Sequence, residues 1–113
     1  MKTDSPHILC INPWIHDFAA FDFWAKPLGL LSLAAILREK GLEVSYIDCL
    51  DRFHPKEAGG LKIFWDGRGP FRKTQIDLPK GLENSGKKYS RYGINPQWFI
   101  EDLKQIKKPD LIF

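Results

Sequence analysis

Cysteine and histidine, the residues that most often bind zinc and iron–sulfur clusters, are scarce in this sequence. Its 113 residues include two cysteines and three histidines. There is no CxxC or CxxxCxxC motif, and no two histidines stand at an HxxxH spacing, so a preassembled metal site is not indicated. Cys10 lies in a predicted strand and Cys49 directly after another. We interpret both as small buried residues in a reducing compartment.

Long apolar runs are also missing. The longest apolar stretch, residues 28–37, is too short to cross a bilayer and contains Gly29 and Ser32. No signal peptide is recognisable, so we expect a cytoplasmic protein. The sequence lacks the GxGxxG fingerprint of dinucleotide binding, a GKS or GKT phosphate loop and a GxSxG nucleophile motif. Catalysis by this chain alone is therefore not expected.

What is present is a βαβ pattern near the N-terminus. Pro13 ends the first apolar run, because proline cannot donate a hydrogen bond to a strand ladder. Pro27 suits a first helical turn, and Gly41 suits the position just after a helix. The two strands should be parallel and joined by a right-handed crossover. The predicted elements are strand His7–Ile11, helix Leu28–Lys40 and strand Glu43–Asp48.

Two further elements are predicted at the end of the chain. Asn95-Pro96 forms a typical start for a helix that covers residues 96–107. The apolar segment Pro109–Phe113 predicts a third, buried strand, and the sequence stops inside it. We expect a fragment of a longer protein, whose missing strands would leave the third strand as an exposed edge. A natural edge in a compact three-stranded protein is the alternative.

Between these elements, residues 52–95 lose the regular apolar spacing. Glycine and proline recur throughout the segment, which we interpret as an irregular insertion in a single domain of residues 1–113. Two extended pieces, Leu61–Trp65 and Lys73–Leu78, could pair as a hairpin around residues 66–69. The Gly67-Arg68-Gly69 segment is interpreted as a turn and not as a phosphate loop, because no helix follows it.

The net charge of +3 is unevenly distributed. Residues 52–95 hold ten Lys or Arg against four Asp or Glu, whereas the remaining residues hold seven against ten. A basic segment of this kind can contact nucleic acid, but its interleaving with glycine and proline is more typical of a solvated surface excursion. We therefore do not expect a nucleic acid partner.

The loop predicted between Asn12 and Lys26 is unusually long for a βα connection. In an open α/β sheet it would lie at the carboxyl ends of the strands, where ligands bind. Its aromatic residues could cap the end of the sheet or face a ligand or a neighbouring domain. These aromatic residues are Trp14, Phe18, Phe21, Phe23 and Trp24.

Acidic residues cluster around the same predicted edge. Asp48 ends the second strand, where a ribose-binding carboxylate stands in dinucleotide folds, but without the glycine fingerprint a strand-end cap is the simpler interpretation. His16-Asp17 could form an acid–base pair, with Asp22 and Asp51 nearby. Solvated loop charges are the alternative for all of them.

Several of these segments occur together in one known family. They are Asn12-Pro13, DFWAKPLGLL at residues 22–31, LAAILREKGLEV at residues 33–44 and IDCLD at residues 47–51. This combination resembles the N-terminal cobalamin-binding-like domain of B12-binding-domain radical SAM proteins, in which the first helix and second strand carry a PxGLxxLAAxLrexGxeVxxID pattern. The similarity also covers Gly67-Arg68-Gly69, Phe71, residues 88–94 and Pro109–Ile112.

The resemblance implies an α/β, flavodoxin-like (Rossmann-like) parallel sheet, truncated after strand three, as the N-terminal module of a cobalamin-dependent radical SAM enzyme. The module would hold a corrinoid or cover a downstream catalytic barrel. That barrel would bind a 4Fe-4S cluster and S-adenosylmethionine in the parent protein only, since this chain lacks the CxxxCxxC motif. The implied corrinoid site comprises Asn12, Pro13, Trp14, Lys26, Pro27, Gly29, Asp48 and Cys49.

The DxHxxG motif, which supplies a lower histidine ligand in other B12 proteins, is missing. A binding module without cofactor is the alternative function. Such a module would dock a protein or nucleic acid partner through the aromatic loop and the basic insertion.

Overall fold

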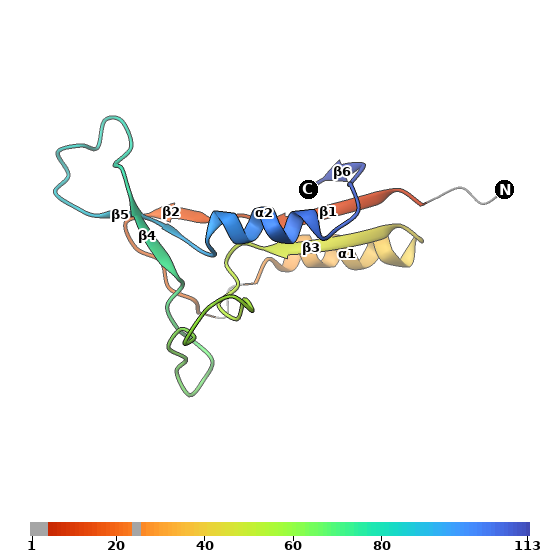
Figure 1. Cartoon of the computed structure of the whole chain (residues 1–113), viewed down its shortest axis with the longest axis horizontal. Coiled ribbons are helices and arrows are strands. Elements are labelled where there is room, and N and C mark those ends of the chain that lie inside the picture. Colours follow the sequence, from red (N-terminus) through yellow and green to blue (C-terminus); the bar gives the residue numbers. More distant parts are fainter. Residues whose placement is uncertain (1–4, 24–25) are drawn as a thin grey trace. The chain divides into compact units, whose positions relative to one another are not determined.

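The computed structural model describes residues 5–23 and 26–113, which divide into two compact units (Figure 1). The parallel unit contains residues 5–12, 26–49 and 96–113, and the antiparallel unit contains residues 13–23 and 50–95. Neither helix of the described residues is long and apolar enough to cross a membrane. The prediction of one domain with an insertion at residues 52–95 stays a prediction.

The parallel unit is built on three strands in the order β3-β1-β6, namely β1 (His7–Asn12), β3 (Glu43–Asp48) and β6 (Leu111–Ile112). Both neighbours pair with β1 in parallel, which confirms the predicted α/β class and the parallel crossover. The predicted third strand is present and, as expected, forms an exposed edge of this sheet. Leu111 and Ile112 are 52% and 59% exposed, because β6 is short and pairs with β1 along one side only.

Helix α1 (Leu28–Glu39) covers one face of this sheet. It ends one residue before the predicted Lys40, in a Schellman motif. Gly41 adopts φ +87°, its N–H donates to the Arg38 carbonyl at 3.0 Å, and the Leu42 N–H donates to the Leu37 carbonyl at 3.1 Å. The core between helix and strands contains Ile8, Cys10, Leu30, Ala34, Leu37, Leu42 and Val44.

The opposite face of β1 is covered as well. Leu9 alternates with Ile8 and Cys10 along the strand and is fully buried. Helix α2 (Pro96–Lys104) precedes β6 and ends before the predicted Lys107. After Lys104 the hydrogen bonds change type. The Gln105 and Ile106 N–H groups donate to carbonyls three residues back, as in a 3₁₀ turn, and not four residues back as in an α-helix.

The antiparallel unit corrects two expectations about loops. Its sheet has the order β2-β5-β4, with β2 (Ile15–Asp17), β4 (Lys73–Ile76) and β5 (Tyr89–Tyr92). The long βα loop thus carries a strand, which pairs with β5. The insertion does contain a hairpin, but β4 pairs with β5 and not with residues 61–65.

Residues 61–65 form no strand because the chain folds back on itself directly after them. The Gly67 N–H donates to the Phe64 carbonyl at 2.9 Å, and the Phe64 N–H donates to the Arg68 carbonyl at 2.8 Å. This tight turn uses backbone groups that a ladder would need. The antiparallel unit has a small core of its own, made by Ile15, Ala20, Leu50, Phe71 and Tyr92.

Candidate functional site

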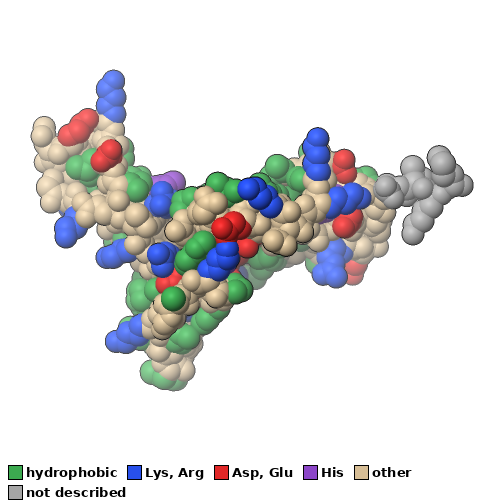
Figure 2. Space-filling model, in the orientation of Figure 1, with side chains coloured by type: hydrophobic (Ala, Val, Ile, Leu, Met, Phe, Trp, Pro, Cys, Tyr) green, Lys and Arg blue, Asp and Glu red, His purple; other side chains and the backbone are tan. Residues whose placement is uncertain are grey.

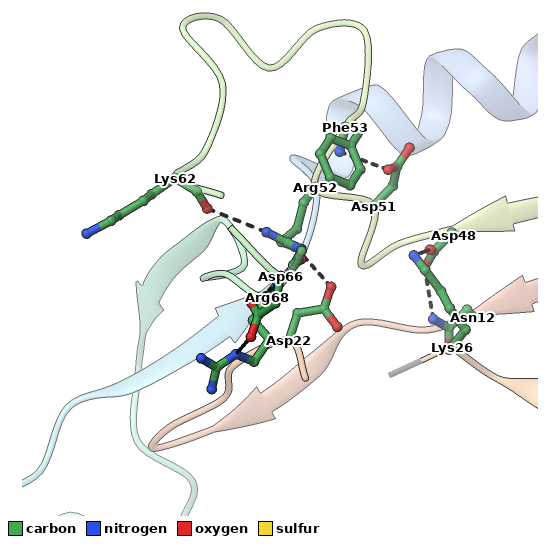
Figure 3. Close-up of polar contacts among 11 residues, drawn as sticks. Asn12, Asp22, Lys26, Asp48, Asp51, Arg52, Phe53, Lys62, Asp66 and Arg68 are labelled. Carbon is green, nitrogen blue, oxygen red and sulfur yellow. Dashed lines mark hydrogen bonds and ion pairs between the residues drawn. The ribbon is translucent and has the colours of Figure 1, made fainter. Parts of the chain in front are cut away.

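Three polar residues meet where β1 and β3 end and α1 begins, and we call them the edge cluster: Asn12, Lys26 and Asp48. The strand register places Asn12 directly beside Asp48. The Asn12 Nδ2 group donates to Asp48 Oδ1 at 2.8 Å, and Lys26 Nζ lies 3.4 Å from Asp48 Oδ2 (Figure 3). Half of the Lys26 side chain is exposed, so its ammonium group can reach a ligand in solvent. The cluster occupies the strand edge at which α/β sheets bind ligands.

Cys49 follows the edge cluster in sequence, but its thiol faces away from solvent. The residue is fully buried, and its N–H donates to the Asn12 carbonyl at 2.8 Å. Burial, together with the negative charge of Asp48, raises the pKa of the Cys49 thiol to about 12. The thiol is therefore neutral near pH 7 and does not act as a thiolate ligand there.

The start of α1 supplies backbone groups beside the edge cluster. Pro27 stands at the N-cap position without a side-chain capping bond, and the first turn contains no acidic residue. Gly29 is exposed, and a Cβ atom built on it would meet nothing within 4 Å. Space for a ligand is thus open at this point.

Two residues of the implied corrinoid site belong to the antiparallel unit. Pro13 is exposed, and the Trp14 indole Nε1 donates to the Ile94 carbonyl at 2.8 Å. The Trp14 ring thus has a structural role within that unit. Hydrogen bonds and an ion pair join Asn12, Lys26, Asp48 and Cys49 into one group within the parallel unit.

The structure gives Asp17, Asp22 and Asp51 local hydrogen-bond partners. Asp17 Oδ1 accepts from the Phe18 N–H at 2.6 Å, Asp51 Oδ1 accepts from the Phe53 N–H at 2.9 Å, and Asp22 pairs with an arginine. Each carboxylate thus has a local structural partner. Across residues 5–23 and 26–113, no three His, Cys, Asp or Glu residues are placed to hold a metal ion.

No family model, curated protein or solved structure matches this chain. The resemblance to B12-binding-domain radical SAM proteins therefore stays a prediction.

One buried polar side chain with several hydrogen bonds was not predicted from the sequence. Arg52 is 97% buried in its side chain, and its Nε donates to Asp22 Oδ2 at 2.9 Å. Its two terminal nitrogens donate to the carbonyls of Gly67 and, at 3.5 Å, of Lys62 (Figure 3). We call Asp22, Arg52, Lys62, Gly67 and Gly69 the arginine cluster. The sequence does not reveal this cluster, because a single arginine in a basic segment resembles a surface charge.

The arginine cluster explains the Gly67-Arg68-Gly69 segment as a turn, as predicted. Gly67 adopts φ +92°, a conformation that glycine tolerates best. Gly69 exchanges two backbone hydrogen bonds with Asp22, at 2.9 and 3.2 Å. A Cβ atom at Gly69 would overlap the Arg52 guanidinium and the Lys62 carbonyl. Both glycines thus serve the fold, and neither forms a phosphate loop.

Replacement of Gly69 by alanine should lower the free energy of unfolding by about 1–3 kcal/mol, the usual cost of overpacking. The backbone carbonyl of Lys62 cannot move aside cheaply. Gly29→Ala is the matched control, since it adds the same methyl group to an open helix position and should stabilise the chain by up to about 1 kcal/mol. Urea unfolding measures both. Equal midpoints for the two variants would contradict the packing described around Gly69.

Aromatic residues of both predicted loops stack with cations beside the arginine cluster. The centre of the Phe21 ring lies 4.9 Å from the centre of the Phe23 ring and 5.7 Å from that of Phe64. The Arg68 guanidinium carbon lies 5.9 Å from the centre of the Phe23 ring and 5.8 Å from that of the Phe64 ring. Arg68 also pairs with Asp66 at 2.8 Å. Desolvation opposes ionisation of Asp66, but the hydrogen bonds and charge of Arg68 outweigh it and lower the pKa of that carboxyl. Trp24 lies outside the described residues.

Proposed function

We propose that the chain is the N-terminal module of a cobalamin-dependent radical SAM enzyme, and that it holds a corrinoid at the edge cluster or covers the downstream barrel of the parent. Support for a flavodoxin-like sheet comes from strand order. The first parallel strand, β1, lies between the second, β3, and the third, β6. Flavodoxin-like sheets begin in the same order and bind cofactors at their carboxyl edge.

The observation that carries the proposal is the edge cluster itself. A corrinoid presents a rim of amide groups, which need both hydrogen-bond donors and acceptors. Lys26 supplies a half-exposed donor, the Asp48 carboxylate can accept more than one hydrogen bond at each oxygen, and the exposed Gly29 leaves room at the helix start. When bound, the corrinoid supplies a cobalt centre for group transfer.

These residues fit the rim of a corrinoid and not its metal. The edge cluster contains no imidazole, and the buried Cys49 thiol is neutral near pH 7. The chain would therefore hold and orient the macrocycle through hydrogen bonds. Its second role, covering the barrel, needs no ligand at this edge.

Titration with hydroxocobalamin, followed by the corrin absorbance after desalting, tests the proposal. The chain should retain the corrinoid, and Lys26→Met should weaken retention about tenfold or more, because a hydrogen bond from a charged donor is lost. Lys107→Met is the matched control. Lys107 pairs with Glu43 at 3.6 Å at the opposite, amino end of β3. Retention by neither the native chain nor its variants, or equal losses from both substitutions, would overturn corrinoid binding at the edge cluster.

The second candidate is a cofactor-free docking module, favoured by exposed aromatic side chains in the antiparallel unit. Trp65 is 95% exposed, and Phe23 and Phe53 are also exposed. Large exposed aromatic residues are typical of interaction surfaces. This candidate predicts that no corrinoid is retained, so the same titration separates the two functions.

A further inference from the structure

One face of the sheet β2-β5-β4 combines aromatic and basic side chains. Along β5, Ser90 and Tyr92 are buried, and Tyr92 belongs to the core of the antiparallel unit. Because side chains alternate along a strand, Tyr89 and Arg91 lie on the opposite face. We call this the outer face. Tyr89 and Arg91 are both half-buried there.

The strand register fills the outer face with a row of polar groups. Arg91 is paired with His16 of β2 on one side and with Thr74 of β4 on the other. Cross-strand partners in an antiparallel sheet share a face, so the three side chains are neighbours. His16 and Thr74 are exposed. The row offers a guanidinium, an imidazole and a hydroxyl to solvent.

A second row on the same face is aromatic. Tyr89 is paired with Ile76, and the Phe18 ring contacts the Tyr89 ring edge-on, with centroids 5.2 Å apart. Lys87 Nζ lies 6.0 Å from the centre of the Phe18 ring. Lys87 therefore lies near the Phe18 ring, and Arg91 stands two residues from Tyr89 on the same face of β5.

The charge of Arg91 is not neutralised by the protein. In the antiparallel unit, Arg52 pairs with Asp22, Arg68 with Asp66 and Arg72 with Glu57. The Arg91 guanidinium makes no ion pair or side-chain hydrogen bond within residues 5–23 and 26–113. The carboxylate of β2, Asp17, alternates away from the outer face. An anionic ligand would therefore meet an available cation.

The whole net charge of the chain belongs to this unit. Residues 13–25 and 50–95 hold ten Lys or Arg against seven Asp or Glu, which gives +3, whereas the rest of the chain is balanced. Figure 2 shows Lys and Arg side chains projecting from the part of the chain that carries β4 and β5. The strand register places Arg91 on the outer face, and the Lys87 ammonium lies near the Phe18 ring.

We propose that the outer face binds single-stranded nucleic acid. Bases would stack on Phe18 and Tyr89, Arg91 and Lys87 would contact phosphates, and Thr74 and His16 would form hydrogen bonds to bases or sugars. Stacking on sheet aromatics with flanking cations is a sequence-tolerant way to hold a single strand. Four-residue strands span about 13 Å, room for about two or three bases.

Single-stranded nucleic acid fits this face better than other polyanions. An acidic peptide would use the cations but would have no group to stack on the aromatic rings. A duplex keeps its bases stacked on one another and would offer phosphates only. The proposal does not rest on corrinoid binding, because no residue of the edge cluster takes part.

Fluorescence anisotropy with a labelled oligouridine of about 12 nucleotides tests the proposal, since that length exceeds the site several times. Tyr89→Leu keeps the apolar bulk but removes the ring, and should lower affinity about tenfold. Arg91→Gln should also weaken binding and reduce the slope of log affinity against log salt by about 0.7. Lys80→Gln is the matched control, because it removes one exposed charge from the connection between β4 and β5, outside the strands.

Several outcomes would overturn the proposal. These are no binding by the native chain at low salt, Tyr89→Leu binding as tightly as the native chain, or Lys80→Gln losing as much affinity as Arg91→Gln. Equal competition by polyglutamate would assign the face to acidic polypeptides instead, and equal affinity for a duplex would exclude stacking. Far-UV circular dichroism checks each variant. If Tyr89→Leu does not fold, Phe18→Leu removes the neighbouring ring and is expected to give the same loss.

Discussion

Replacement of Arg52 by methionine is expected to lower the free energy of unfolding by about 3–5 kcal/mol, the cost of breaking a buried ion pair from one side. The side chains of Arg52 and Asp22 are only 3% and 8% exposed. Methionine fills much of the same space but leaves the Asp22 carboxylate without its guanidinium. It also removes the donors to the Gly67 and Lys62 carbonyls. The loss is a large part of the stability of a domain this size.

Urea unfolding followed by circular dichroism measures this loss. Arg72→Met is the matched control, because Arg72 pairs with Glu57 at 3.0 Å but keeps 37% of its side chain exposed. An exposed pair contributes about 0–1 kcal/mol. Equal costs for the two arginine variants would contradict the structural role of Arg52. The double variant Asp22→Leu/Arg52→Met should cost less than the sum of its single changes, and its remaining cost would report the two carbonyls that lose their donor.

The parallel unit could be predicted from sequence because its signals are local. Proline before α1, glycine after it and apolar spacing between them set the helix within one residue. Strands β1 and β3 were predicted in the same way, from apolar runs and the residues that end them. The rules for short crossover connections then allow few topologies. The end of α2 was overestimated, since nothing in residues 104–107 forbids a helix. Only the tightened hydrogen bonds of the last turn end it.

The antiparallel unit could not be predicted, because its pairings are not local. Strand β2 has three residues and pairs with β5, which lies some 75 residues further along the chain. A segment of that length carries too little alternation to be distinguished from a loop. Residues 61–65 have more alternation than β2 but form no strand, since the turn that follows them takes up their backbone groups. In both segments, contacts with distant parts of the chain, and not the local sequence, determine whether a strand forms.

Some residues of the candidate sites could likewise be predicted from the sequence, and others could not. Asn12 and Asp48 could be placed together because both end parallel strands, and strand ends meet at one sheet edge. Lys26 joined them through its position before α1. Arg52 could not be found, because its partner Asp22 is 30 residues away and the Gly67 carbonyl is 15 residues away. Spacing in sequence carries no information about contacts of that kind.

Alkaline pH should destabilise the chain through Cys49. Burial and the charge of Asp48 raise the pKa of this thiol to about 12, whereas an unfolded cysteine ionises near pH 8.5–9. Between these values the unfolded chain has released the proton and the folded chain still holds it. Each pH unit in that window therefore lowers the free energy of unfolding by about 1.4 kcal/mol. The contribution is fully present below pH of about 9 and is lost as pH rises toward the folded pKa of about 12.

The comparison of the native chain with Cys49→Ala isolates this effect from the lysines and tyrosines that also titrate at high pH. The substitution leaves a small cavity, whose cost does not depend on pH. From pH 9 to pH 10.5 the native chain should lose about 2 kcal/mol more than the variant in urea unfolding. The same alkaline slope in both proteins would show that Cys49 ionises freely in the folded state. Its thiol would then be open to solvent at the carboxyl edge of β3, and the assignment of Cys49 as an inert neighbour of the edge cluster would be wrong.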